Sequence, residues 1–288
     1  MLGAMLKVDE FESEFRRASK RRFLHCPPRI ERVLILSDLE GDAQREYGQA
    51  ARELLGDLGR GIEFVERGGG SFEGVEGVFA LLEEISPSLV CTYRNLRSDA
   101  WRWAHSLGVY LSALIRATEL PVLITPNPRA ISPDAWRSKA SEDVMVITDH
   151  LVGDDALVSW GAALTDSGGR LHLAHMEHDG VYARYMDAIS KISTIDTEHA
   201  REAILDQLLR EAREYVSSCA KGLGEAGIPL EIAEHVGSGH RVRDFRALIE
   251  AEGVDVLVIP SLEEDTIALH GVSYSLAVEL VERPLLMV

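Results

Sequence analysis

The sequence predicts an α/β fold of two tandem, doubly wound parallel-sheet domains, the first of which lacks one helix–strand unit. Three observations predict it. Segments 32–43 and 143–156 each end an apolar strand in Ser/Thr-Asp and continue to a Gly-Asp. Segments that begin at Gly108 and Gly271 each read Gly-Val, a helical stretch, a proline and a short apolar strand. The strands are continuous Val/Ile/Leu runs, as sheets covered on both faces require.

The landmarks of the two copies are unevenly spaced. Asp38 and Asp149 lie 111 residues apart, whereas Gly108 and Gly271 lie 163 residues apart. The second copy therefore holds about 52 more residues between its landmarks. We expect these residues to form one loop, one helix and one strand that the first copy lacks.

In the first copy, strands and helices alternate after the opening strand, which implies parallel strands joined by crossover helices. The pattern predicts a helix at 43–58, a strand at 62–66, a Gly-rich turn at 68–70, a helix at 73–85, a strand at 88–92, a helix at 101–118 and a strand at 121–125.

The second copy alternates in the same way around its insertion. The long helix has the clearest signal, because Ile204, Leu208 and Val216 belong to a set of residues that recur at spacings of three and four. The pattern predicts a helix at 155–166, a strand at 170–176, a loop at 179–196, a helix at 197–222, a strand at 230–236, a helix at 241–252, a strand at 254–260, a helix at 271–282 and a strand at 284–288.

These elements divide the chain into four parts. Residues 1–30 form a basic extension, 31–126 a truncated first domain, 127–143 a proline-containing linker and 144–288 the second domain. The net charge of −17 argues against nucleic-acid binding, because phosphates would be repelled. No apolar run approaches the ~18 residues that a membrane span needs. Three cysteines without CxxC spacing fit a reducing, cytoplasmic location.

The strand-ending aspartates, the order of elements and the Gly-then-Pro endings resemble the universal stress protein family in its tandem form. The resemblance spans roughly residues 30–288 and implies a Rossmann-like strand order of 3-2-1-4-5 in each copy, with strand 3 missing from the first. It also implies that the fifth strands pair, so that 121–125 and 284–288 would join the domains as a pseudo-dimer. A homo-oligomer is a further expectation.

Many members of this family bind ATP through an aspartate after strand 1 and a loop of the form G-x2-G-x9-G-[ST]. Asp38 and Asp149 match the aspartate, and Gly108 and Gly271 match the last glycine. In the second copy, however, segment 260–266 contains one proline and three acidic residues where glycines would hold phosphates. We therefore expect no ATP or other adenine nucleotide as a cofactor there. Further candidate ligand residues in this copy are His175, Met176, Ser261 and Ser273.

The corresponding loop of the first copy also lacks the first two glycines but offers Arg94, Arg97 and Arg102. Arginines can hold an anion through charge-assisted hydrogen bonds without a glycine cradle. Trp101 or Trp103 could stack on a base. The alternative interpretation is a solvated helix start whose tryptophans pack in the core, with Asp38 only organising the turn.

The sequence gives no sign of catalysis or of a metal centre. Neither GxSxG nor HExxH occurs. His172, His175 and His178 cannot converge on one ion from a single strand, so no metal site is expected. The chain is therefore interpreted as a non-catalytic, stress-response or regulatory protein with decayed ATP sites. The alternatives are a binding module for an anionic small molecule and a slow nucleotide hydrolase.

Overall fold

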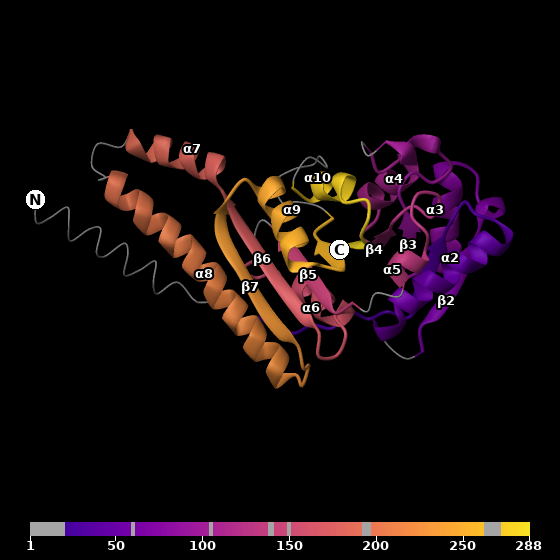
Figure 1. The fold of residues 1–288 in the computed structure, drawn as a ribbon, viewed down its shortest axis with the longest axis horizontal. Helices are drawn as coiled ribbons and strands as arrows, with labels where there is room; N and C mark the ends of the chain where they lie inside the picture. The colour runs from indigo at the N-terminus through magenta and orange to yellow at the C-terminus, as the bar shows by residue number, and fades with distance from the viewer. Residues whose placement is uncertain are drawn as a thin grey trace, which may run out of the picture.

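The computed structural model describes residues 21–58, 61–103, 106–137, 141–148, 151–191, 197–261 and 272–288. Within these residues, the strands form one nine-stranded sheet in the order β2-β1-β3-β4-β9-β8-β5-β6-β7, with helices on both faces (Figure 1). Neighbouring strands are parallel except β4 and β9, which are antiparallel. The predicted fold class is confirmed.

The first half contributes four strands in the order β2-β1-β3-β4, so it lacks one helix–strand unit as predicted. Its strands and helices are β1 (Arg32–Leu36), α2 (Gly41–Leu54), β2 (Glu63–Arg67), α3 (Gly74–Ile85), β3 (Leu89–Tyr93), α4 (Val109–Ala117) and β4 (Val122–Thr125). Short 3-10 helices are η1 (Gly56–Leu58), η2 (Gly69–Ser71) and η3 (Asp99–Arg102).

The second half contributes five strands in the order β9-β8-β5-β6-β7, which is the complete doubly wound arrangement. A short helix, α5 (Asp134–Arg137), precedes it. Its elements are β5 (Asp143–Thr148), α6 (Asp155–Leu164), β6 (Arg170–His178), α7 (Asp179–Ser190), α8 (Thr197–Glu225), β7 (Glu231–Gly239), α9 (Arg241–Glu252), β8 (Val256–Ile259), α10 (Val272–Glu279) and β9 (Leu285–Met287).

Two predicted elements were wrong. The loop predicted at 179–196 contains helix α7, in which Met186 is fully buried, so the segment has an apolar face that packs. The helix predicted at 101–118 begins only at Val109, because Gly108 has a φ of +87° and the α-helix cannot continue through it.

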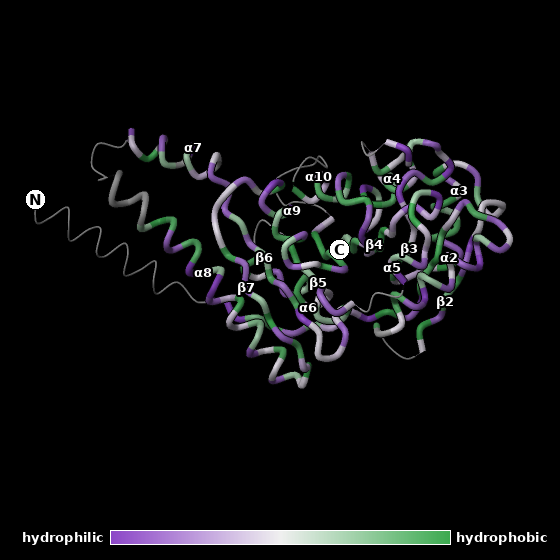
Figure 2. The backbone as a smooth tube through the Cα atoms, in the orientation of Figure 1, coloured by the Kyte–Doolittle hydropathy of each residue, from purple (hydrophilic) through white to green (hydrophobic). Residues whose placement is uncertain are grey.

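The core consists of two clusters of buried apolar side chains. One cluster lies beneath α4, α9 and α10, and the larger one lies beneath α2, α6 and α8 and extends to α3. Figure 2 shows hydrophobic and hydrophilic residues alternating along α8, which covers β7. No helix in the described part of the chain is both long and apolar enough to cross a membrane.

The two halves meet where β4 pairs with β9. Leu123 lies opposite Leu286, with Val122 opposite Met287 and Ile124 opposite Leu285. All the side chains at this seam are buried. These are the segments that the sequence predicted to join. Because each would otherwise present an apolar sheet edge, the pairing removes a surface that favours aggregation.

Arg94 reinforces the seam from the end of β3. Its side chain is buried, Nε donates to the carbonyl oxygen of Ala277 at 2.7 Å and Nη2 donates to that of Leu280 at 2.9 Å. These carbonyls belong to the C-terminal end of α10, where unpaired carbonyls carry the negative end of the helix dipole. Burial lowers the pKa of Arg94 to about 10, so the guanidinium stays charged at neutral pH.

The ends of the predicted extension and linker are also packed. Residues 1–20 lie outside the described part of the chain. After them, Phe23 is buried and its N–H donates to Ser218 Oγ in α8 at 3.0 Å, and Cys26 N–H donates to Ser159 Oγ in α6 at 3.0 Å. In the linker, Trp136 is buried against the first half.

Replacing Arg94 should weaken the whole fold. We expect Arg94→Ala to lower the free energy of unfolding by about 3 kcal/mol, because it leaves a cavity and unsatisfied helix carbonyls. Arg94→Lys should lose about 1–2 kcal/mol, since an ammonium group cannot reproduce the planar fork. Urea denaturation measures both changes. The exposed Arg102→Ala is the control, and an Arg94→Ala protein as stable as this control would contradict the role of Arg94.

Candidate functional site

The antiparallel pairing of β4 with β9 places the two candidate ligand-binding crevices at opposite ends of the strands. In doubly wound sheets, ligands bind beyond the carboxyl ends of the strands, where the crossover direction changes. In the first half this point lies after β1 and β3, and in the second half after β5 and β8. Because β4 and β9 run in opposite directions, these two points face away from each other. Each crevice must therefore be considered separately.

Asp38 follows β1 at the first of these two points, and its side chain is only 6% exposed. Its Oδ1 accepts hydrogen bonds from the Tyr93 hydroxyl and from Arg129 Nη1, the latter at 2.8 Å, and its Oδ2 accepts one from Arg97 N–H at 2.6 Å. The N–H of Asp38 in turn donates to Tyr93 Oη at 3.1 Å. Asp38, Tyr93, Arg97 and Arg129 form what we call the Asp38 network. Both carboxylate oxygens are therefore occupied by the protein itself.

The electrostatics of this network keep Asp38 ionised. Burial alone would raise the pKa of Asp38, but the hydrogen bonds from Arg129, Tyr93 and the Arg97 backbone outweigh burial and lower it below its usual value. Burial and the neighbouring carboxylate raise the pKa of Tyr93 well above its usual value. At neutral pH the phenol therefore stays protonated and donates to an ionised carboxylate.

The loop after β3 is held in an unusual backbone conformation. Asn95 and Arg97 have positive φ values of 61° and 54°, which cost roughly 1–2 kcal/mol for residues other than glycine. Side-chain contacts fix the turn: the Arg97 guanidinium donates to the carbonyl oxygens of Gly69 and Phe72 and lies 4.7 Å from the centre of the Phe72 ring. The Arg97 side chain is thus held by the segment between β2 and α3, which stands where the second half has its additional helix and strand.

The structure does not bring the three candidate arginines together. Arg94 is buried against the end of α10, and Arg97 is held by Gly69 and Phe72. Arg102 is exposed, and its guanidinium lies 5.3 Å from the centre of the Trp101 ring. Their guanidinium groups have different partners and do not form a common anion cradle.

Gly108 has a clear packing role at the start of α4. A Cβ atom at this position would lie 2.8 Å from the Cα atom of Asn95, and the φ of +87° also favours glycine. Asn95 N–H donates to the carbonyl oxygen of Leu107 at 2.9 Å, which fixes the close approach. The positive φ and the close approach to Asn95 therefore both favour glycine at position 108.

Much of the second crevice lies outside the described residues, including Asp149, Gly271 and the acidic segment 263–265. At its border, buried His175 has Nε2 3.0 Å from Glu177 Oε1, and no partner for its Nδ1 is found among the described residues. Met176, Ser261 and Ser273 are each at least partly buried, and Ser261 N–H donates to Val288 at 2.8 Å.

A histidine cluster at the opposite edge of the second half was not predicted. His172 Nδ1 on β6 lies 3.0 Å from His235 Nε2 on β7, and one ligand atom each from His172, His235 and Glu252 lie within 4.8 Å of one another. The sequence places His172 and His235 63 residues apart and does not reveal which residues of β6 and β7 are neighbours. The expectation that no further metal ligands exist therefore overlooked this cluster.

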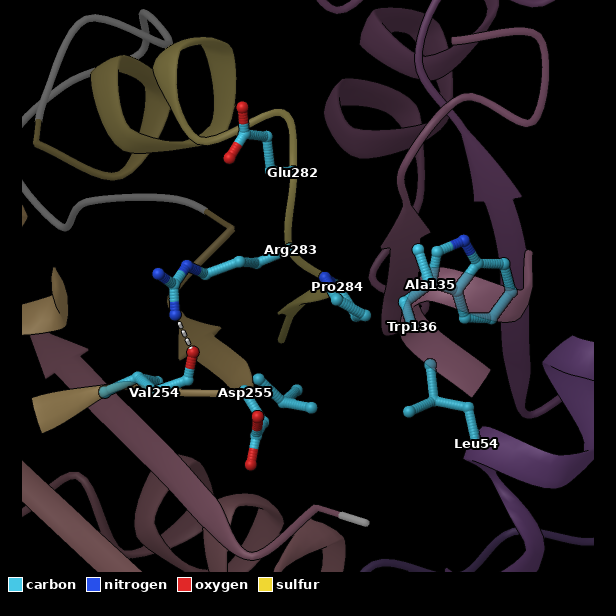
Figure 3. A pocket seen from close by; sticks show the side chains of 9 residues that line it. Leu54, Ala135, Trp136, Val254, Asp255, Glu282, Arg283 and Pro284 are labelled. Atoms are coloured by element: carbon cyan, nitrogen blue, oxygen red, sulfur yellow. Dashed lines mark hydrogen bonds between the residues drawn. The ribbon is translucent and has the colours of Figure 1, made fainter. Parts of the chain in front are cut away.

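A small cavity lies between the two halves (Figure 3). Leu54 and Trp136 line one side, whereas Val254, Arg283 and Pro284 line the other. The Arg283 guanidinium donates to the Val254 carbonyl oxygen. With a volume of about 20 Å³, the cavity has room for about one water molecule and belongs to the packing of the seam.

Comparison with known proteins supports the fold. No family model and no curated protein matches the chain. Among solved structures, a functionally unknown protein from Pseudomonas aeruginosa PAO1 has a TM-score of 0.50 and 13% identity over 90% of this chain and 92% of that one. A protein provisionally assigned to the universal stress proteins, from Pseudomonas aeruginosa UCBPP-PA14, has a TM-score of 0.50 and 12% identity over 90% and 93%. At these identities the similarity shows the fold alone.

Removing the Asp38 charge should destabilise the protein in a pH-dependent way. We expect Asp38→Asn to lower the free energy of unfolding by about 2–3 kcal/mol at pH 7, because three donors lose a charged acceptor. A lowered pKa in the folded state stabilises the protein fully above the unfolded value of about 3.9 and loses this effect as pH falls through the folded value. The difference in free energy of unfolding between wild type and variant, which we call the gap, should therefore shrink below about pH 4.

Urea denaturation at several pH values measures this gap. Asp42→Asn provides a matched control, because Asp42 lies four residues away with a side chain that is 91% exposed. An Asp38→Asn effect no larger than that of the control, or a gap that does not change with pH, would contradict the assignment.

Proposed function

We propose that the chain is a non-catalytic stress-response or regulatory protein of the universal stress protein type. In its first half, the protein's own side chains close the position where a nucleotide would bind. The observation that supports this proposal is the Asp38 network. In the resembling family, the matching aspartate contacts the adenine end of the nucleotide. Here Tyr93, Arg97 and Arg129 already occupy the oxygens that a ligand would need.

A nucleotide would have to displace these contacts. Hydrogen bonds to a charged group contribute about 1.5–3 kcal/mol each, so replacing two of them costs several kcal/mol before a ligand gains any affinity. The loop that would face the phosphates provides few groups to bind them. The loop after β3 has Asn95 and Arg97 at its two left-handed positions, and the Arg97 side chain is engaged with Gly69 and Phe72.

In the second half the support comes from charge. Glu263, Glu264 and Asp265 follow β8 in the sequence, where a phosphate-binding loop would need glycines and a neutral or positive field. Each carboxylate near a triphosphate would oppose binding by about 1 kcal/mol or more, depending on the local dielectric. The proposal therefore extends to both halves.

The two alternatives have weaker support. Anion binding by Arg94, Arg97 and Arg102 would require three guanidinium groups to converge, and they contact different parts of the fold. Slow nucleotide hydrolysis would require a carboxylate that is available to a water or metal ion, whereas Asp38 is saturated with donors. A regulatory role in the cytoplasm and a homo-oligomeric state remain predictions.

An ATP titration of the full-length protein tests the proposal. We expect isothermal titration calorimetry to detect no saturable binding of ATP in the presence of Mg²⁺, because the sequences after β3 and β8 lack the first two glycines of a phosphate-binding loop. Native mass spectrometry of freshly purified protein should likewise show the bare chain mass. The opposite result would be stoichiometric, low-micromolar binding that Asp38→Asn abolishes and Asp42→Asn preserves. That pattern would mean that the Asp38 network opens for a nucleotide.

A further inference from the structure

A cluster of two histidines and one glutamate lies toward the amino-terminal ends of the strands in the second half of the sheet. His172 is the third residue of β6, His235 lies on the neighbouring β7, and Glu252 is the last residue of α9. His172 pairs with Ala233 and Ala174 pairs with His235, so the histidines are two positions apart on adjacent strands and share one face. The candidate nucleotide crevice of this half lies at the other edge.

The two imidazole rings direct one nitrogen each toward the other. Their planes are 17° apart, and the distance from His172 Nδ1 to His235 Nε2 is 3.0 Å. Two nitrogens bound to tetrahedral zinc at about 2.0–2.1 Å lie about 3.3 Å apart, which is close to the observed separation. To bind an ion, both nitrogens would have to turn toward it, and the Glu252 carboxylate, whose ligand atom lies within 4.8 Å of both, would have to move closer. We propose that His172, His235 and Glu252 bind a divalent transition-metal ion of the zinc type.

Asp143 fixes the orientation of His172. The Oδ1 atom of Asp143, at the start of β5, lies 3.0 Å from His172 Nε2. A carboxylate that accepts the Nε2 proton leaves Nδ1 deprotonated, with its lone pair directed toward His235. A carboxylate on the far side of a histidine is the usual support for a metal-bound imidazole. His235 would carry its own proton on Nδ1 when Nε2 binds the ion, so coordination needs a change of the His235 tautomer as well as this movement toward the ion.

The charges around the cluster favour a cation. Glu252 and Asp143 are acidic, and the C-terminal end of α9 directs the negative end of its dipole toward this region. The opposing charge is Arg170, whose Nη1 lies 3.6 Å from Asp143, while its Nε lies 3.1 Å from Glu231. Arg170 also interacts electrostatically with Glu252, so a bound ion would share this carboxylate with the Arg170 guanidinium.

The cluster can be reached from solvent. His172 is fully buried, but His235 and Glu252 are half-buried. An open groove between β7 and α9 is lined by His235 together with Val236, Leu248 and Ala251. An ion could therefore arrive from the His235 side, and water would complete a tetrahedral site with three protein ligands.

Zinc titration of chelator-treated full-length protein tests this site. We expect one Zn²⁺ per chain, and Co²⁺ in its place should give the intense visible absorption of a tetrahedral complex. His235→Gln should weaken Zn²⁺ binding by more than about 100-fold, because even the loss of a supporting residue costs 10–100-fold. For the same reason Asp143→Asn should weaken it about 10–100-fold. Glu252→Gln should weaken binding and change the Co²⁺ spectrum.

The matched control is His240→Gln. His240 also stacks on a histidine of β6, His178, with ring centres 6.5 Å apart, but it lies at the other edge and is 67% exposed. Circular dichroism melting of the metal-free variants separates loss of folding from loss of ligand. The proposal is overturned if wild type shows no saturable Zn²⁺ binding, if folded His235→Gln binds as wild type does, or if His240→Gln loses as much affinity. The histidine pair would then be a hydrogen-bonded packing feature only.

Discussion

The antiparallel pairing of β4 with β9 is the constraint on which the arrangement of this molecule depends. Two short apolar strands, which would each be an exposed edge in a separate domain, bury one another through Leu123 and Leu286. The pairing turns two parallel sheets into one sheet. It also inverts the second half relative to the first. The side of the sheet that holds the carboxyl ends of the strands in one half therefore holds their amino ends in the other. The positions of the candidate sites follow from this inversion.

The inversion explains why Arg94 binds the other half of the protein and not a ligand. A residue at the carboxyl end of β3 would face a ligand in an isolated doubly wound domain, but here it meets the C-terminal end of α10 from the other half. Its charge is satisfied by helix carbonyls and is not available to a phosphate. In the neighbouring crevice, Arg129 reaches Asp38 from the segment that leads out of the first half. The connection between the halves thus helps to close the first crevice, while the histidine cluster lies beyond the seam at the amino edge of the second half.

The sequence predicts the architecture well because the architecture is written in local patterns. Continuous apolar strands, helical spacing and the repeated Gly-to-Pro ending suffice for the order of elements along the chain and for the missing unit, whereas the strand order in the sheet comes from the resemblance to the universal stress protein family. The exceptions also have local causes. At Gly108 a positive φ interrupts the predicted helix, and at 179–190 a glycine and short polar residues concealed the apolar face that buries Met186. The sites were less predictable, because the pairs Asp38–Arg129 and His172–His235 are separated by 91 and 63 residues. They depend on strand register and on where the linker packs, which no short-range pattern encodes.

Hydrogen–deuterium exchange of the full-length protein tests most directly whether the seam makes the two halves one cooperative body. Peptides that cover Val122–Thr125 and Leu285–Met287 report on β4 and β9, and peptides from β1 and β5 report on the core of each half. If the seam is an integral part of the fold, β4 and β9 should exchange as slowly as β1 and β5, through global unfolding. Faster exchange at β4 and β9, with β1 and β5 still protected, would show that the halves separate while each stays folded, and would contradict the account.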